Sequence, residues 1–424
     1  DEFMKEYPTS PLIPQAKFSL AEAQMQSEEY KAAEETLRSI IALDIPRTHE
    51  ILPAAQLQVA FCRYYQDDPE GMSNALATVV GEYAASPEAG EALYWLGYLM
   101  RSQRAYASAA RNYERIVSDY QGCPFAHEAA YLIGECYVLD NQPVPAIQKF
   151  LDAFTHFPDA GYTAYALIRG AELYLERAQI DGWLGELDKL AEGAGKGGDV
   201  LAVARAAALQ RAGKLDDAAA ALARLDISAL PPELAGLSLA VQAAIENGKG
   251  QFAAAAKTAA GAAAVAEQSK VGLNEALYQL ARAYYGQKDW TQAADAFRRL
   301  IGECVIPNAK VNAIALLDLA HALTEFGDMD DVVKLCDDAV RLRPGPELTA
   351  RSLILKGDAM MKVNEYQKAA QYYQRATILY GKLAEYAVPA FRGLITAYTK
   401  LGLTEDAGKA KQEFAQRYPD EAGK

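Results

Sequence analysis

Long apolar runs and basic clusters are both missing from this sequence. No segment approaches the ~20 consecutive apolar residues that a helix needs to cross a bilayer. The longest segment of low polarity, residues 252–266, is mostly alanine and contains Lys257, which favours a thin, tightly packed helix. Lysine and arginine form no cluster, and the formal net charge is −14. Because nucleic-acid binding needs clustered cations that displace counterions, we expect neither a nucleic-acid partner nor a membrane span in this segment.

Cysteine is scarce and shows no paired spacing. Five cysteines are an odd number in a chain of 424 residues, so no complete disulfide framework is implied. Cys62, Cys136 and Cys336 fall at apolar helical positions, where we expect buried thiols. Cys123 and Cys304 fall near loops and should be more accessible. Neither has a second cysteine or a histidine at the spacing that indicates a metal or redox site.

Motifs of known chemistry are missing as well. The sequence has no His-Glu-x-x-His, Gly-x-Ser-x-Gly or Gly-x-Gly-x-x-Gly motif. Gly195 and Lys196 are followed by Gly197, where a phosphate-binding loop requires serine or threonine. The acidic runs at 67–70 and 328–331 lack the alternating ligands of a calcium loop and are expected to lie at helix starts. We therefore predict a protein that is not an enzyme and that has no catalytic residues, cofactors or metal ions.

Repetition is what the sequence does contain. The clearest period is 37 residues, which separates Gly97 from Gly134, Ala109 from Ala146 and Tyr113 from Phe150. Towards the C-terminus the same kind of position recurs at nearly equal intervals, at Trp290, Met329, Tyr366 and Thr404. One period therefore runs through the chain, as in proteins built from stacked repeats.

Each repeat predicts two amphipathic helices joined by a short polar turn. The two helical runs have roughly 12–15 residues with apolar positions three and four residues apart. Residues 287–289 are one such turn. A small residue, such as Gly97 in the first run or Ala109 in the second, lets the helices approach closely, and a bulky aromatic nearby fills the space beside the contact. Several repeats end in proline, as at Pro158 and Pro344, which stops the second helix.

This pattern resembles the tetratricopeptide repeat, a helix–turn–helix unit of ~34 residues with a Trp-Leu-Gly-Tyr style signature. Residues 94–98, Tyr-Trp-Leu-Gly-Tyr, carry the likeness most plainly. The close-contact position recurs from Ala21 to Ile395 in ten steps of similar length, on average slightly longer than the family's unit. The intermediate positions are Val59, Gly97, Gly134, Gly170, Ala206, Ala243, Ala281, Ala320 and Gly357. The resemblance implies an all-α fold, a right-handed α-solenoid superhelix of about eleven repeats.

The longer period and the junctions resemble repeats of bacterial cell-envelope proteins. Residues 7–11, Tyr-Pro-Thr-Ser-Pro, and residues 92–97 are similar to repeats in outer-membrane assembly lipoproteins and in periplasmic coordinators of the Tol–Pal system. The likeness implies a periplasmic or outer-membrane-associated protein of a Gram-negative-type bacterium, with a cytoplasmic scaffold as the alternative. Residues 1–8 also resemble the repeat end at 414–419, so we expect the natural protein to extend upstream.

Composition divides the chain into three predicted parts. Residues 1–190 form an N-terminal array of about four to five repeats that starts in the middle of a repeat, and residues 271–424 form a C-terminal array of about four. Residues 191–270 are rich in alanine and glycine, poor in aromatics, and predicted to hold degenerate repeats. Because repeats in a solenoid contact only their neighbours, this thinly packed part is predicted to let the two arrays bend.

The stacked helices predict a scaffold that binds partner proteins or peptides. By resemblance, the first helices of the repeats line a concave surface and expose residues beside the close-contact position. Tyrosine dominates the N-terminal set, whereas cations in the C-terminal set suit an acidic segment. The alternative for many of the tyrosines is packing between neighbouring repeats. The candidate partner-binding residues are Phe18, Tyr94, Tyr98, Arg101, Tyr131, Glu135, Tyr174, Tyr278, Arg282, Tyr285, His321, Arg351, Lys362 and Arg392.

Two other functions stay open at the level of sequence. The chain is alternatively a regulatory or recruiting region of a larger multidomain protein, or a self-assembling structural protein that forms oligomers. The upstream sequence separates the first alternative from an envelope scaffold, and light scattering at several concentrations tests the second.

Overall fold

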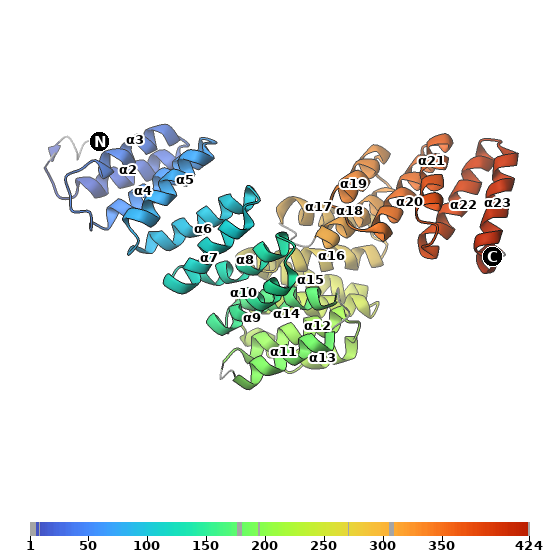
Figure 1. The fold of residues 1–424 in the computed structure, drawn as a ribbon, viewed down its shortest axis with the longest axis horizontal. Coiled ribbons are helices and arrows are strands. Elements are labelled where there is room, and N and C mark those ends of the chain that lie inside the picture. Colours follow the sequence, from blue (N-terminus) through green and yellow to red (C-terminus); the bar gives the residue numbers. More distant parts are fainter. Residues whose placement is uncertain are drawn as a thin grey trace. The chain divides into compact units, whose positions relative to one another are not determined.

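The computed structural model describes residues 6–7, 9–175, 180–193, 196–269, 271–304 and 309–422. Within these residues the regular structure is entirely helical, as the sequence predicts (Figure 1). The chain forms two compact units, Asp1–Ala204 and Arg205–Lys424. The boundary lies inside residues 191–270, the part predicted to hold degenerate repeats. The three-part division itself stays a prediction.

The helices form consecutive pairs, each a first and a second helix joined by a short turn. In the N-terminal unit the pairs are α2 (Ile13–Gln26) with α3 (Tyr30–Ile41), α4 (Ile51–Tyr65) with α5 (Pro69–Glu82), α6 (Pro87–Ser102) with α7 (Tyr106–Asp119), α8 (Ala126–Leu139) with α9 (Pro143–His156), and α10 (Gly161–Leu175) with α11 (Ile180–Gly193). Helix α12 (Gly198–Arg211) contains the boundary between the units and is followed by α13 (Leu215–Leu222).

The C-terminal unit continues the same alternation. After the 3₁₀ turn η1 (Ile227–Ala229), its pairs are α14 (Pro232–Gly248) with α15 (Phe252–Ser269), α16 (Leu273–Gly286) with α17 (Trp290–Glu303), α18 (Ala309–Leu323) with α19 (Met329–Arg341), α20 (Pro346–Lys362) with α21 (Tyr366–Leu379), and α22 (Ala384–Lys400) with α23 (Thr404–Arg417). The short α24 (Pro419–Ala422) follows. Helices α2 to α23 make eleven pairs, which agrees with the predicted number of repeats.

Every predicted close-contact position lies on the first helix of its pair, including the least regular ones, Val59, Gly170 and Ala243. Glycine is needed where an aromatic side chain of the second helix lies across the first. A Cβ on Gly97 would stand 2.6 Å from Cε1 of Tyr113, and one on Gly357 would stand 2.5 Å from Cε1 of Tyr373. The predicted pairing of a small residue with a bulky aromatic is thus confirmed. The same relation joins Gly134 to Phe150 and Gly170 to Trp183.

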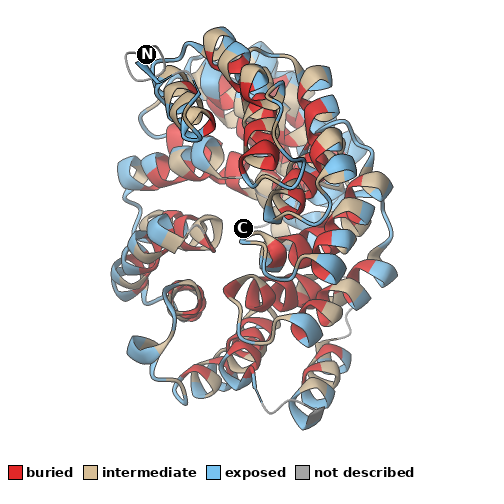
Figure 2. Cartoon of the chain, turned by 90° about the vertical axis from the view of Figure 1, so that its left-hand side faces the viewer, coloured by how far each residue is buried: buried red, intermediate tan, exposed pale blue. Residues whose placement is uncertain are grey.

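Contacts in the stack are short in range. Among the described residues, helices pack against the next helix along the chain or the one after that, and the ion pair of Arg211 on α12 with Glu275 on α16, at 3.3 Å, reaches further. Buried residues accordingly lie on the faces that helices turn toward these neighbours (Figure 2).

In α15, which carries the alanine-rich segment, Ala255, Ala259 and Ala262 are fully buried, so small side chains permit close packing here as expected. Gly250 forms the preceding turn, whereas Gly195 of the other glycine-rich stretch lies outside the described residues.

Other local predictions hold in the structure. Cys62, Cys136 and Cys336 are buried, and burial raises the pKa of the Cys62 thiol to about 11. Cys123 and Cys304 are half-buried and free. The acidic runs lie at helix starts, where the Asp68 carboxylate accepts a hydrogen bond of 2.8 Å from the amide of Gly71. Among the described helices, none is both long and apolar enough to cross a membrane.

Nine of the described turns between a first and a second helix share one conformation, and the turn between α18 and α19 differs because none of its residues has positive φ. In the shared conformation a residue with positive φ ends the first helix, and the next amide bonds to the carbonyl five residues earlier, as from Ala105 to Met100 at 2.8 Å. In three turns this residue is glycine, which adopts positive φ without strain. Six turns place other residues there, at Glu28, Asp67, Arg104, Asn141, Lys288 and Asn364.

Glycine at one of these strained positions should stabilise the protein. Arg104 has φ of 61°, and left-handed backbone costs a residue with a side chain roughly 1–2 kcal/mol. We expect Arg104→Gly to raise the free energy of unfolding by about 0.5–1 kcal/mol, the part of this strain that remains after the greater entropy of glycine in the unfolded chain is subtracted. Urea denaturation measures the change. Gln103→Gly is the matched control, since Gln103 has φ of −82° and glycine there should destabilise. Equal shifts in the two variants would contradict the argument.

Candidate binding surface on the first helices

First helices lie on the inner side of the stack within each unit. In the N-terminal unit α4 contacts α6, α6 contacts α8 and α8 contacts α10, and in the C-terminal unit α18 contacts α20 and α20 contacts α22. Within the described residues no two second helices of neighbouring repeats approach as closely. In a curved stack the elements on the inner side are the closer together. The concave surface in each unit is therefore lined by first helices, as the resemblance implies.

A row of polar contacts joins three successive first helices of the C-terminal unit. Tyr285 on α16 and His321 on α18 are hydrogen-bonded, with 2.6 Å between the hydroxyl oxygen and Nδ1. Arg351 on α20 donates from Nη2 to Oδ1 of Asp318 on α18, at 2.5 Å. Because these contacts cross from one repeat to the next, they fix both the spacing and the side-chain orientation along the surface.

The electrostatics of this row follow from partial burial. Asp318 is only 5% exposed, and Arg351 supplies its compensating charge. Burial, followed by the nearby Arg351 guanidinium, lowers the pKa of His321, so the imidazole favours its neutral form. On the next helix pair Asp358 accepts a hydrogen bond from the Tyr373 hydroxyl at 2.6 Å, and burial raises the pKa of Asp358.

Of the cations predicted for the C-terminal surface, Arg351 is half-buried and the other three are exposed, and most of the four have carboxylate partners. Lys362 Nζ lies 3.2 Å from Oε1 of Glu325, and Arg392 Nη2 lies 3.6 Å from Oε2 of Glu421. Arg282 differs, because its guanidinium lies over the Tyr278 ring at 5.9 Å and donates to that hydroxyl at 3.3 Å. Arg282 is therefore the exposed cation of this surface that contacts an aromatic ring in place of a carboxylate.

In the N-terminal unit several candidate residues serve packing between repeats. Tyr131 is 5% exposed and its ring lies 5.0 Å from that of Tyr165 on the next first helix. Glu135 is 3% exposed and its Oε1 accepts a hydrogen bond of 2.8 Å from Nε of Arg169. The expected exposure is therefore wrong for Tyr131 and Glu135, because the next repeat covers both positions.

Other aromatic candidates are held by neighbouring rings. Tyr94 stacks on Phe125, with ring centroids 4.3 Å apart and planes 18° apart. Tyr174 lies beside Trp183 at 5.2 Å, and Phe18 packs against the buried core of the first two helix pairs. For these residues the structure favours the packing alternative.

Tyr98 is exposed on α6, and Arg101 on the same helix is half-buried. Tyr98 is 38% exposed and packs edge-on against Trp95, with ring centroids 5.7 Å apart. Trp95 in turn contacts Phe61 of the preceding first helix at 5.5 Å. Sequence reasoning missed this supporting ring, although Trp95 adjoins Tyr94 in the quoted motif. It also missed Asp318, whose signal is a carboxylate three residues before His321 within an apolar helix.

An exposed aromatic cluster at the end of α4 was also missed. Tyr30 and Tyr65 stack with centroids 4.7 Å apart, and Tyr64 contacts Tyr65 at 5.4 Å. Tyr64 and Tyr65 are 47% and 55% exposed. The sequence signal is the Tyr-Tyr pair directly before the turn. No group of three or more His, Cys, Asp or Glu side chains gathers as a metal site within the part of the chain that the structure describes.

Comparisons with known proteins bear on the repeat type. Residues 99–160 and residues 275–304 each match a family model of the tetratricopeptide repeat. A search of curated proteins found no match. One similar solved structure is a chain in the crystal structure of the APC/C hetero-tetramer Cut9-Hcn1, with 13% sequence identity, a TM-score of 0.41, and coverage of 98% of this chain and 89% of that one. Together with the eleven helix pairs, the two family matches support repeats of the tetratricopeptide type.

Proposed function

We propose that this protein is a non-enzymatic scaffold that holds partner proteins or peptides against the first helices of its repeats. Repeats of the tetratricopeptide type build extended concave surfaces for protein–protein interaction. The observation that carries the proposal is the row of linked side chains on α16, α18 and α20. It includes Tyr285, His321 and Arg351, with Arg282 exposed beside it.

Preorganisation is the physical advantage of that row. Side chains that are already hydrogen-bonded to neighbouring repeats lose little conformational entropy when a partner binds. Exposed Arg282 supplies a guanidinium that can hold a carboxylate of the partner with two parallel hydrogen bonds. On the N-terminal unit, Tyr98 offers an exposed ring supported by Trp95. The occupant best matched to the C-terminal surface is therefore an acidic segment that also carries apolar side chains.

Charge reversal at Arg282 tests the proposed surface. Arg282→Glu should reduce the recovery of specifically bound partner proteins about tenfold, the loss expected when a central contact is replaced by a repulsive one. Affinity capture from a lysate of the source cells, quantified by mass spectrometry, measures the change. Arg341→Glu is the matched control, because Arg341 on the second helix α19 is 76% exposed. Tyr98→Ala tests the N-terminal surface in parallel. If both surface variants recover the same partners as the wild type, the proposed surface is wrong.

We also propose that the scaffold works in a bacterial cell envelope. The support is the likeness of residues 7–11 and 92–97 to repeats of envelope proteins; Pro8 of the first motif lies outside the described residues. Fractionation of the source cells, followed by detection of the natural protein with an antibody, tests this location. Recovery with the periplasm or outer membrane is expected, and recovery with the cytosol would overturn the location while leaving the scaffold function intact.

A further inference from the structure

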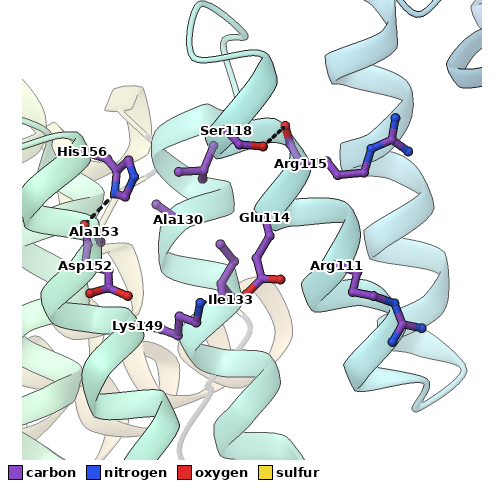
Figure 3. Close-up of a pocket in the computed structure, with 11 residues that line it drawn as sticks. Arg111, Glu114, Arg115, Ser118, Ala130, Ile133, Lys149, Asp152, Ala153 and His156 are labelled. Carbon is purple, nitrogen blue, oxygen red and sulfur yellow. Dashed lines mark hydrogen bonds and ion pairs between the residues drawn. The ribbon is translucent and has the colours of Figure 1, made fainter.

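A groove opens on the outer side of the N-terminal unit, between second helices α7 and α9 (Figure 3). Its volume is about 490 Å³, within the range of sites that hold a small ligand or a few side chains of a peptide. The groove follows from the curvature of the stack. First helices touch, so second helices stand apart, and here the outer face of α8 is left between them.

Its floor is apolar. Val117 from α7, Ala130 and Ile133 from α8, and Ala153 from α9 line it, and all four are buried. The floor thus offers contact area without a polar group that would have to be desolvated. Bulky apolar side chains are the groups that such a floor accommodates best.

The rim of the groove is polar, and several of its side chains are already bonded to one another or to the backbone. Lys149 on α9 and Glu114 on α7 form an ion pair of 2.8 Å that spans the groove, so these two charges satisfy one another. Nδ1 of His156 lies 2.9 Å from the backbone oxygen of Asp152, which can only accept, so Nδ1 carries the proton and donates. The Asp152 carboxylate accepts a hydrogen bond from Gln148 at 2.9 Å.

Two arginines of the rim remain without an ion-pair partner among the described residues. Arg111 and Arg115 lie four residues apart on α7, and both are exposed. Arg111 donates to the neutral hydroxyl of Ser108 at 2.8 Å. In Figure 3 both guanidinium groups extend from α7 on the side away from the groove. A bound peptide that leaves the groove by crossing α7 would therefore pass both guanidinium groups.

We propose that this groove is a second docking site, for a partner-protein segment that places a bulky apolar side chain on the floor and adjacent carboxylates against Arg111 and Arg115. An apolar centre with a polar rim is the usual anatomy of a protein interface. Charge favours such an acidic segment, because Arg111 and Arg115 are exposed cations of the rim that have no carboxylate partner among the described residues. The scaffold would then hold one partner on each side of the same repeats.

Peptide selection tests the site although the partner is unidentified. A phage library of random peptides is selected on the whole protein, and enriched peptides are synthesised and measured by fluorescence anisotropy. We expect sequences with a bulky apolar residue beside two or more Asp or Glu residues. Arg111→Glu/Arg115→Glu should weaken their binding at least tenfold. Ser118→Trp should do the same by filling the groove, and Ser118 is exposed, so the fold tolerates the change.

Controls separate this proposal from the inner surface. Arg298→Glu/Arg341→Glu reverses two exposed arginines on other second helices and should leave binding unchanged. Arg282→Glu should weaken only those peptides that bind the inner surface, and the peptides that the groove variants weaken should bind Arg282→Glu as they bind the wild type. The groove is overturned if no acidic–apolar peptide is enriched, or if the groove variants bind the peptides as the wild type does. Loss of binding with Arg282→Glu alone would place the peptides on the inner surface, which keeps the scaffold function and removes this site. A dimer in sedimentation velocity that Ser118→Trp dissolves would make the occupant a second copy, and would also overturn the proposal.

Discussion

Replacing Arg169 by methionine is expected to lower the free energy of unfolding by about 3–5 kcal/mol, the usual cost of breaking a buried ion pair from one side. Arg169 Nε lies 2.8 Å from Oε1 of Glu135, and the two side chains are 6% and 4% exposed. Methionine fills much of the space but leaves two carboxylates without Arg169 as a partner, the buried one of Glu135 and the mostly buried one of Glu172. Urea denaturation of the whole protein measures the loss. Hydrogen exchange in α8 and α10 shows whether the destabilisation is greatest at these two helices.

The pH dependence of that loss identifies its cause. Burial already raises the pKa of Glu135 above its ordinary value, and removal of Arg169 should raise it further. A carboxyl whose folded-state pKa is raised binds protons more readily in the folded protein, so stability increases as pH falls through that pKa. The deficit of Arg169→Met should therefore shrink as the pH is lowered from neutral towards the ordinary pKa of a glutamate. Glu135→Gln/Arg169→Met should recover much of the stability at neutral pH. A deficit independent of pH would mean that lost packing, and not the unpaired charge, is responsible.

The second large effect is expected at Trp183. Its side chain is fully buried, lies across Gly170 and contacts Tyr174 at 5.2 Å. Trp183→Ala should cost about 3–5 kcal/mol, because it removes a large apolar side chain and leaves a cavity between α10 and α11. Hydrogen exchange should become faster in these two helices first, since each repeat is stabilised by its neighbours.

A double-mutant cycle shows whether the glycine and the aromatic form one packing unit. Gly170→Leu alone should destabilise, because a Cβ at that position overlaps the Trp183 ring. Gly170→Leu/Trp183→Ala should be less destabilised than the sum of the two single changes by more than about 1 kcal/mol, since the new side chain occupies the vacated space. Strict additivity would mean that the two positions act separately.

The repeat and its helices were predictable because they depend on local sequence. Apolar spacing defines each helix, and the close-contact residue and the aromatic opposite it belong to the same repeat, as Gly97 and Tyr113 do. Even Val59 and Ala243, where the motif is least regular, lie on first helices as predicted.

Exposure at the surface was not predictable in the same way, because it depends on the next repeat. Tyr98 and Glu135 each follow a close-contact glycine by one residue, yet Tyr98 is 38% exposed and Glu135 is 3% exposed. The difference comes from Arg169, which the following repeat places beside Glu135. A repeat's own sequence does not contain that information, so equivalent positions in neighbouring repeats can have opposite roles.

The short range of the contacts also bears on how the chain folds during synthesis. Apart from the ion pair of Arg211 with Glu275, helices in the described residues pack against helices no more than two places along the chain, so a repeat has its packing neighbours as soon as the next pair has left the ribosome. Proteins dominated by such local contacts fold quickly, because little loop-closure entropy is lost before each contact forms. Folding is then expected to proceed from the N-terminal end in step with translation, with only the newest repeat exposing its unpaired apolar face to other nascent chains.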